Sequence, residues 1–316
     1  MFTNRSSSAS LTELRNLFRN HFQENVLFDA PLKEHVAYRV GGPADILVFP
    51  RTETDLIWIS DQARHFHLPV TIIGRGTNLL VKDSGLRGIT VSLEKAFREI
   101  EVVTPAKEQL TTWVRAGGGV SKPELLNWAV ERGLAGLEFS SGVPGSIGGG
   151  IFMNAGTKYG CYGDILKELR VFDFSKGART LTRDQFHFGY REQNAVKDSL
   201  VLWATFEMKP GDPQALRQEV ERIIQERAEK QPLDYPSCGS TFKNPPGHSA
   251  GRLIEKTGLK GRTVGGAQIS EKHANFILNK GNATAQDILD LIQLTKDTVS
   301  AQFGVTLECE VIILGN

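Results

Sequence analysis

This sequence has few cysteines, almost no net charge and no long apolar run. The three cysteines, Cys161, Cys238 and Cys309, lie far apart and form no Cys-x-x-Cys pair. Zinc sites and disulfide frameworks need closely patterned cysteines, so the sequence predicts neither, and we expect no bound metal. Cysteines scattered in this way are typical of proteins from a reducing compartment.

Charge and hydropathy argue against two classes of partner. The 37 basic and 36 acidic residues leave a net charge of +1, so no overall field attracts nucleic acid or an anionic membrane. No apolar run has the length of a membrane span, and the polar start of the chain lacks the apolar core of a signal peptide. We therefore expect a soluble, cytoplasmic protein with no nucleic-acid, membrane or obligate protein partner.

Glycine is the residue that the sequence has in excess. There are 32 glycines in 316 residues, with clusters at 41–42, 74–76, 85–88, 117–119 and 142–150. Such clusters form turns, and they let backbone N–H groups approach a ligand that a Cβ atom would exclude. The sequence therefore predicts that local backbone, rather than an overall charge, holds any anionic ligand.

Periodicity and capping signals predict a chain of mixed helices and strands. Helices are expected at 10–22, 52–67, 121–133, 213–230 and 284–303. Capping signals mark four of them: Ser10 with Glu13, Thr52 with Asp55 and Ser121 with Glu124 at the start, and Gly304 as the C-cap of the last. Strands are expected at 45–49, 70–73, 89–93, 111–116, 169–174, 200–208, 275–279 and 310–314. Because these elements follow no steady βαβ rhythm, the predicted fold class is α+β. The Pro-Gly-Asp-Pro loop at 210–213 is the best candidate for a domain boundary.

Residues 74–79, Gly-Arg-Gly-Thr-Asn-Leu, follow a short predicted strand. The third glycine of a Rossmann fingerprint is missing because Leu79 stands in its place, and no helical pattern follows. The sequence thus argues against a Rossmann site. It leaves two interpretations open, a turn whose N–H groups bind phosphate or a plain structural turn.

A second glycine-rich segment at 140–150 is more specific. It lacks the lysine of a Walker A loop, which argues against a magnesium nucleoside triphosphate. Because it has little side chain to pack, we expect a loop, and ordering so flexible a loop is costly unless a ligand contacts its backbone. The apolar residues at 151–153 argue against a plain linker.

Several other candidate residues carry little information on their own. The Gly-x-Ser-x-Gly pattern around Ser249 matches a nucleophile elbow, but the two preceding prolines disfavour the strand that an elbow requires, so we interpret it as chance. The histidines show no metal-ligand spacing. Taken alone, the local sequence indicates only a loop arginine at Arg191, a turn serine at Ser240 and an edge-strand carboxylate at Glu310.

Taken in order, six stretches resemble the UDP-N-acetylenolpyruvoylglucosamine reductase family. They are residues 38–44, 74–80, 141–156, 188–191, 238–245 and 310–315. The resemblance implies a two-lobed FAD-binding domain of the vanillyl-alcohol-oxidase type at 1–211, with the lobe boundary near 95–110. It also implies an α+β substrate-binding domain at 212–308 and a strand at 309–316 that returns to the first lobe. The chain looks like the shorter type of the family, which lacks a substrate-clamping tyrosine loop.

The same resemblance implies roles for individual residues. Arg191 and Glu310 would polarise the substrate, and Ser240 would deliver a proton. Substrate contacts are implied for Tyr190, Lys243, Asn244 and His273. Cofactor contacts are implied for Gly74, Arg75, Gly76, Thr77, Asn78, Leu79, Ser141, Gly142, Val143, Pro144, Gly145, Ser146, Gly148, Asn154, Ala155 and Gly156.

The implied reaction is the reduction of UDP-N-acetylglucosamine enolpyruvate to UDP-N-acetylmuramate, with NADPH as reductant and FAD as cofactor, in peptidoglycan precursor synthesis. We expect the FAD to be non-covalent because residues 74–80 include no histidine. Three alternatives stay open, since a fold alone does not fix chemistry. They are an FAD oxidase of the same fold, an inactive nucleotide-sugar-binding protein, and a hydrolase that uses Ser249.

Overall fold

The first lobe is built on a four-stranded sheet. In the computed structural model, which describes residues 5–103 and 110–315, the strand order is β1-β2-β5-β3; β1 is antiparallel to β2, and β5 is parallel to both its neighbours. These strands are β1 (Val26–Pro31), β2 (Pro43–Val48), β5 (Leu86–Ser92) and β3 (Val70–Ile73). Three of them match predicted strands, whereas β1 lies where the sequence predicts none.

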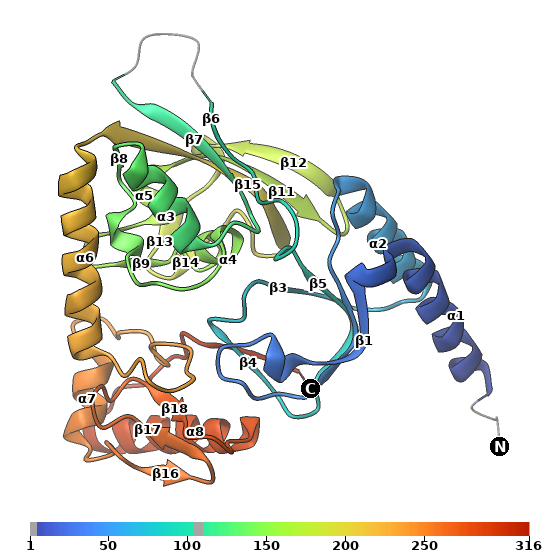
Figure 1. The fold of residues 1–316 in the computed structure, drawn as a ribbon. Coiled ribbons are helices and arrows are strands. Elements are labelled where there is room, and N and C mark those ends of the chain that lie inside the picture. The colour runs from blue at the N-terminus through green and yellow to red at the C-terminus, as the bar shows by residue number, and fades with distance from the viewer. Residues whose placement is uncertain (1–4, 104–109, 316) are drawn as a thin grey trace.

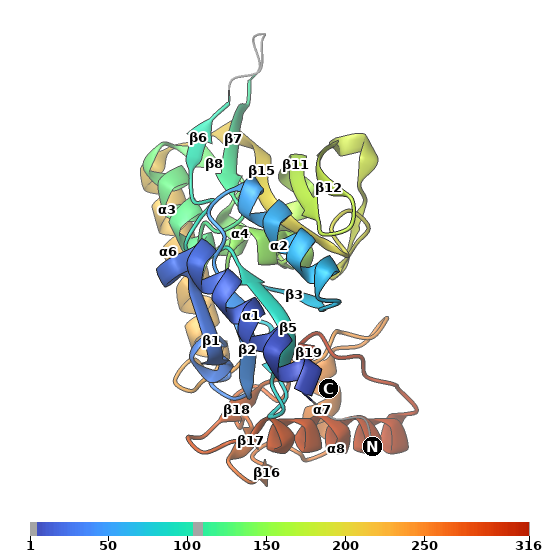
Figure 2. The same cartoon turned by 90° about the vertical axis from the view of Figure 1, so that its right-hand side faces the viewer.

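Two helices, α1 (Arg5–Phe22) and α2 (Glu53–His65), cover one face of this sheet (Figure 2). Their apolar faces pack on the strands: Phe18 and Ile59 are fully buried, in one hydrophobic cluster with residues of β2 and β5. Thr52 and Asp55 form the capping box that the sequence predicts for α2. The predicted start of α1 is wrong, because the helix begins at Arg5 and Ser10 lies inside it. Serine is tolerated within a helix, so a capping signature alone does not fix the boundary.

The second lobe is built on a larger, six-stranded sheet around β15 (Ser199–Pro210). Its order is β12-β11-β15-β7-β6, with β8 also paired to β15, and each of these pairs is antiparallel. The other strands are β6 (Ile100–Val102), β7 (Thr112–Gly117), β8 (Leu134–Ala135), β11 (Leu166–Asp173) and β12 (Gly177–Thr182). Two short hairpins flank the sheet: β9 (Gly156–Thr157) with β10 (Gly160–Cys161), and β13 (Phe188–Gly189) with β14 (Glu192–Gln193).

In the described part of the chain, four helices pack against this lobe: α3 (Lys122–Glu131), α4 (Ile147–Phe152), α5 (Tyr162–Ile165) and α6 (Pro213–Lys230). They share a core with the strands, in which Val120, Ile147 and Phe206 are fully buried. The capping box of Ser121 and Glu124 begins α3 as predicted. Helix α6 runs along one side of the molecule, from the second sheet towards the carboxyl-terminal helices (Figure 1).

The segment at 140–150 is only partly the loop that the sequence predicts. Residues from Ile147 onward form α4, so the expectation of a loop throughout is wrong. Ser146 is the N-cap, since its hydroxyl accepts a hydrogen bond from the Gly149 N–H at 3.3 Å. Ile147 and Ile151 lie four residues apart on one helical face and are both fully buried, which offsets the low helix propensity of the glycines between them.

The carboxyl-terminal module is smaller and packs against the first lobe. It contains α7 (Ala250–Lys256), β16 (Thr263–Val264), β17 (Ala267–Ile269), β18 (Ile277–Asn279) and α8 (Ala285–Phe303). Gly304 ends α8 with a φ of 67°, the left-handed cap that the sequence predicts. Tyr38 and Leu80 of the first lobe belong to the core of this module, so the two parts share one hydrophobic cluster.

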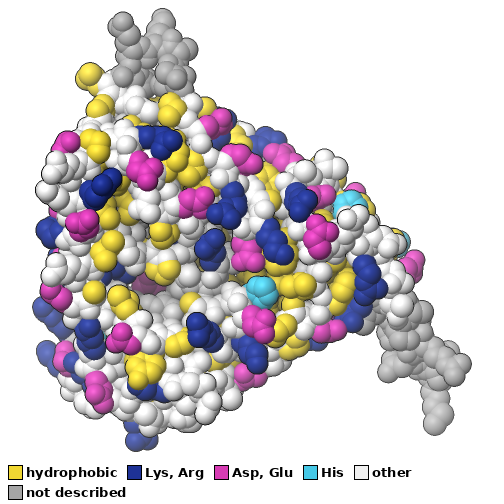
Figure 3. Space-filling view, viewed as in Figure 1, with side chains coloured by type: hydrophobic (Ala, Val, Ile, Leu, Met, Phe, Trp, Pro, Cys, Tyr) yellow, Lys and Arg dark blue, Asp and Glu magenta, His cyan; other side chains and the backbone are white. Residues whose placement is uncertain are grey.

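The chain ends in β19 (Ile312–Leu314), which pairs in parallel with β4 (Leu79–Val81). The predicted strand began at 310, so Glu310 lies just before the strand rather than in it. No helix in the described part of the chain is long and apolar enough to cross a membrane. Basic and acidic side chains are interspersed over the face shown in Figure 3.

Candidate active site

A cavity of about 1220 Å³ is lined by both lobes and by the chain that leads into the carboxyl-terminal module. Drug-sized ligands occupy pockets of roughly 300–1,000 Å³. The cavity is therefore large enough for an extended ligand such as a dinucleotide. The catalytic residues that the resemblance implies, Arg191, Ser240 and Glu310, all line it.

The turn at 74–79 joins β3 to β4 and supplies one stretch of the cavity lining. All six residues for which the resemblance implies cofactor contacts in this turn line the cavity. Gly76 has a φ of +63°, and a Cβ atom there would lie 2.2 Å from the carbonyl oxygen of His35. At Gly74, a Cβ atom would lie 2.9 Å from Oγ of Ser146. Only glycine lets this turn lie so close to its neighbours.

The second glycine segment lies against the first. Gly142, Val143, Pro144, Gly145, Ser146, Gly148, Ala155 and Gly156 all line the cavity, as the resemblance implies. Gly145 has a φ of +120°, and a Cβ atom there would lie 2.8 Å from Oγ1 of Thr77. The two glycine segments therefore meet, and together they present backbone rather than side chains to one side of the cavity.

Two of the expected cofactor contacts, Ser141 and Asn154, do not line the cavity. The hydroxyl of Ser141 donates to the carbonyl of Glu138 at 2.7 Å. The amide of Asn154 donates to the carbonyl of Gly189 at 2.7 Å and accepts from the Gly163 N–H at 2.9 Å. Both side chains are buried and hydrogen-bond to the protein's own backbone, so their contact with a cofactor stays a prediction.

Arg191 and Glu310 form an ion pair in the wall of the cavity. Nε of Arg191 lies 2.5 Å from Oε1 of Glu310, and both side chains are largely buried. Arg191 also donates to the carbonyl of Gly156 at 3.1 Å and has a positive φ of 54°. A positive φ is uncommon for a residue other than glycine, and such strain is concentrated at functional sites.

Ser240 is brought to the same place by the backbone of its neighbour. The carbonyl of Thr241 accepts a hydrogen bond from the Glu310 N–H at 2.8 Å. The side-chain amide of Asn78, in the glycine turn, donates to the Glu310 carbonyl at 2.9 Å. These bonds tie the glycine turn, the serine loop and the end of the chain to one another.

The four expected substrate contacts do not line the cavity. The hydroxyl of Tyr190 accepts from the Asn244 N–H at 3.3 Å, and Lys243 pairs with Glu308 at 3.5 Å. Nδ1 of His273 accepts from a backbone N–H at 3.2 Å, and burial lowers the pKa of this imidazole. Their role in binding substrate stays a prediction.

Ser249 takes part in no catalytic arrangement with this cavity. Its hydroxyl accepts from the Arg252 N–H at 3.4 Å, and it is the N-cap of α7. A turn, not a strand, precedes it, so the geometry of a nucleophile elbow is not met.

Two basic residues that the sequence does not single out also line the cavity. Lys122 is only 6% exposed, and Arg227 reaches the cavity from α6. Burial, with smaller contributions from the positive charges of Arg191 and Arg227, lowers the pKa of Lys122 to about 8. No periodicity or motif marks either residue, because each reaches the cavity only through the tertiary fold.

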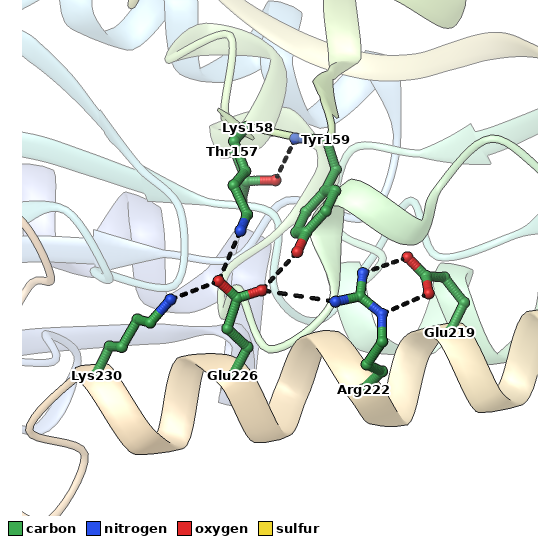
Figure 4. A network of polar contacts seen from close by, with 7 residues as sticks. All are labelled: Thr157, Lys158, Tyr159, Glu219, Arg222, Glu226 and Lys230. Carbon is green, nitrogen blue, oxygen red and sulfur yellow. Dashed lines mark hydrogen bonds and ion pairs between the residues drawn. The ribbon is translucent and has the colours of Figure 1, made fainter.

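A surface network fastens the β9–β10 hairpin to α6 beside the cavity (Figure 4). Glu226 accepts from Lys158 at 2.6 Å, from the Tyr159 hydroxyl at 2.5 Å and from Lys230 at 2.8 Å. These hydrogen bonds, that of Lys158 foremost, hold the pKa of Glu226 well below its usual range. Arg222 lies 3.7 Å from Glu226 and pairs with Glu219 on the same helix. The network connects the hairpin at Thr157 to the turn of α6 that carries Arg227.

Comparison with known families identifies the class of protein to which this chain belongs. Residues 44–181 match the model described as an FAD binding domain. Residues 231–314 match the model described as the UDP-N-acetylenolpyruvoylglucosamine reductase C-terminal domain. The chain is therefore an FAD-binding oxidoreductase with a two-lobed α+β architecture and a carboxyl-terminal module, which confirms the predicted fold class.

Relatives identify the particular family. The chain is 40% identical over 305 residues to the UDP-N-acetylenolpyruvoylglucosamine reductase of Moorella thermoacetica, covering 96% of this chain and 98% of the relative. It is 42% identical over 301 residues to that of Clostridioides difficile, covering 95% and 97%. The solved structure of the Thermus caldophilus reductase (MurB) superposes with a TM-score of 0.76 at 32% identity, covering 92% of this chain and 98% of that one. The chain belongs to the UDP-N-acetylenolpyruvoylglucosamine reductase family.

Proposed function

We propose that this enzyme uses NADPH and non-covalently bound FAD to reduce UDP-N-acetylglucosamine enolpyruvate to UDP-N-acetylmuramate, in cytoplasmic synthesis of peptidoglycan precursor. One observation carries the proposal. The buried Arg191–Glu310 pair and Ser240 line the same glycine-lined cavity, which is large enough for a dinucleotide. We further propose that residues 1–211 form the FAD-binding domain, that 212–308 bind substrate and that 309–316 complete the first lobe.

The residues present fit FAD. A Cβ atom at Gly74, Gly76 or Gly145 would collide with neighbouring protein atoms, so the two segments can touch only because these residues are glycine. The glycines of both segments line the cavity with backbone, which suits the close approach of a diphosphate. No histidine is found among the described residues that line the cavity. Cys238 also lines it, but burial raises the pKa of its thiol to about 12, so it stays protonated and unreactive. Both observations support non-covalent binding.

The chain's own residues supply what the second half of the reaction requires. When bound, FAD would carry hydride from NADPH to the terminal carbon of the substrate's enol ether. Negative charge then develops on the adjacent carbon and its carboxylate. The guanidinium of Arg191 is positioned to stabilise this charge, and Glu310 fixes its orientation through the 2.5 Å contact. The hydroxyl of Ser240 donates the proton, which a serine can do only to a strongly basic carbon.

Stopped-flow absorbance of Ser240→Ala tests this assignment. The variant should be reduced by NADPH at the wild-type rate, because no substrate proton moves in that half-reaction. Its reoxidation by the enolpyruvyl sugar nucleotide should slow by about a hundredfold to ten-thousandfold. Ser249→Ala serves as the matched control, since it removes a serine hydroxyl outside the cavity. Equal loss of both half-reactions in Ser240→Ala would falsify the role as proton donor.

A further inference from the structure

Lys122 is a buried cation that has no acidic partner among residues 5–103 and 110–315. Its side chain lines the cavity and is 6% exposed. Within the described residues no carboxylate lies at ion-pair distance from its ammonium, and Glu310, the acid beside Arg191, is already paired. Burying an unpaired charge is energetically costly, so such groups are rare unless a ligand supplies the counter-charge.

The lysine is held in place by its own helix and by glycines opposite it. It is the first residue of α3, whose N-cap is Ser121, and its N–H donates to the carbonyl of Gly145 at 2.9 Å. A Cβ atom on Gly145 would lie 3.2 Å from Cε of Lys122, and one on Gly150 would lie 3.1 Å from the same carbon. The absence of side chains at these two positions leaves the room in which the lysine stem lies.

Neighbouring charges make the position of Lys122 unfavourable without a ligand. Arg191 and Arg227 both act electrostatically on its ammonium. Arg191 is neutralised by Glu310, whereas Arg227 has no ion pair in the described chain. Two unpaired cations and one paired cation therefore lie close together around the cavity, an arrangement that favours an anionic ligand.

The ammonium also lies where the two glycine segments meet. A Cβ atom on Gly145 would be 3.3 Å from Nζ of Lys122 and 2.8 Å from Oγ1 of Thr77. The hydroxyl of the 74–79 turn and the ammonium therefore approach the same point above the 142–149 segment. An anion at this junction would find a hydroxyl donor, an ammonium donor and glycine backbone together.

We propose that the Lys122 ammonium pairs with a phosphate oxygen of the bound dinucleotide, at the junction of the two glycine segments. The inference rests on the proposed FAD cofactor and assigns to this lysine the counter-charge for its diphosphate. A charge-assisted hydrogen bond in a buried site contributes more than a neutral one and is lost when the ammonium is removed.

Lys122→Met tests the proposal, because methionine keeps the length and removes the charge. The dissociation constant of FAD, measured by flavin fluorescence on wild type and variant, should rise by about tenfold to a hundredfold. Lys256→Met, at the exposed end of α7 and away from the cavity, should leave it unchanged. The thermal midpoint of the FAD-free variant should equal or exceed that of FAD-free wild type, because a repelled buried charge has been removed.

Two further measurements locate the counter-charge. The flavin midpoint potential should be unchanged in Lys122→Met, because the diphosphate carries the same charge in both redox states. A shifted potential would overturn the phosphate assignment, because the lysine would then pair with the reduced flavin ring. Weaker binding of substrate with unchanged FAD affinity would also overturn it, because the lysine would then pair with the substrate. If neither Lys122→Met nor Lys122→Gln folds, the lysine is needed by the fold, and the proposal is wrong. Wild-type protein that binds no FAD would instead refute the proposed function.

Discussion

The cavity has two unlike sides. The glycine side, residues 74–79 and 142–149, presents backbone whose shape is set within each segment and by the contact between them. The charged side, Arg191, Ser240, Glu310, Arg227 and Lys122, presents side chains that come from five separate stretches of the chain. The Arg191–Glu310 contact joins residues 119 positions apart, and the bond from Asn78 to Glu310 spans 232. The shape of the glycine side is thus largely determined within local segments, whereas the arrangement of the charged side chains beside it depends on the whole fold.

The difference predicts that substitutions of Arg191, Ser240 and Glu310 impair chemistry while leaving the fold largely intact. Arg191→Ala should show the largest effect. Reoxidation by the enolpyruvyl sugar nucleotide should slow by on the order of a thousandfold, because the developing negative charge loses its stabilising cation. Reduction by NADPH should change far less, and rapid-mixing absorbance separates the two steps.

The matched control for Arg191→Ala is Arg217→Ala, which removes an exposed guanidinium from α6 outside the cavity lining. It should retain both half-reactions. If Arg191→Ala instead loses FAD or unfolds at a much lower denaturant concentration, the arginine maintains the cavity, and the division into two sides fails.

Substitution on the glycine side should impair folding before chemistry. Gly76→Ala forces a positive φ on alanine and places its Cβ 2.2 Å from the His35 carbonyl oxygen. Backbone strain and overpacking together should lower the free energy of unfolding by about 3 kcal/mol or more. Urea denaturation with a two-state fit gives this quantity.

Gly258→Ala isolates the steric part of that effect. Gly258 has a φ of +76°, close to the +63° of Gly76, but a Cβ atom there would meet nothing within 4 Å. Its substitution should cost only the strain, about 1 kcal/mol. If the two variants lost the same free energy of unfolding, the close approach to the His35 carbonyl at Gly76 would contribute nothing to the effect.

The same contrast explains how much could be predicted from sequence. Capping boxes at Thr52 and Ser121 and the left-handed cap at Gly304 are local, and the structure bears them out. The two glycine segments were recognisable as candidate ligand contacts because composition alone limits what they can do. Ser146 and its buried isoleucines convert part of the second segment into α4, a tertiary effect that composition conceals.

On the charged side, only Arg191, Ser240 and Glu310 could be predicted, because the resemblance to a known family implied a role for them. Arg191 lies in a loop and Glu310 just before a short strand, and no pattern connects them. Lys122 stands at the first position of a helix, where a lysine usually faces solvent, and it is buried only because α3 packs beside Gly145 and Gly150. The expected substrate contacts failed to reach the cavity lining for the same reason, since adjacency in a motif does not determine where a side chain points.

The smallest expected effect tests how the two sides are held together. Glu226→Gln should weaken the network between the β9–β10 hairpin and α6, because the carboxylate accepts from two lysines and a tyrosine. The hairpin supplies Thr157 and the helix supplies Arg227 to the cavity. Loosening them should raise KM for the sugar nucleotide by no more than about fivefold, since exposed ion pairs are individually weak.

Steady-state kinetics at low and high ionic strength measure this effect, and Glu221→Gln, on the same helix outside the network, is the control. The difference between wild type and Glu226→Gln should shrink in high salt, because salt screens the pairs that the substitution removes. A fall in kcat with unchanged KM would give the network another role. Gly156, in the same hairpin, accepts a hydrogen bond from Arg191 at 3.1 Å, so the hairpin would then be positioning the guanidinium of Arg191 rather than the substrate.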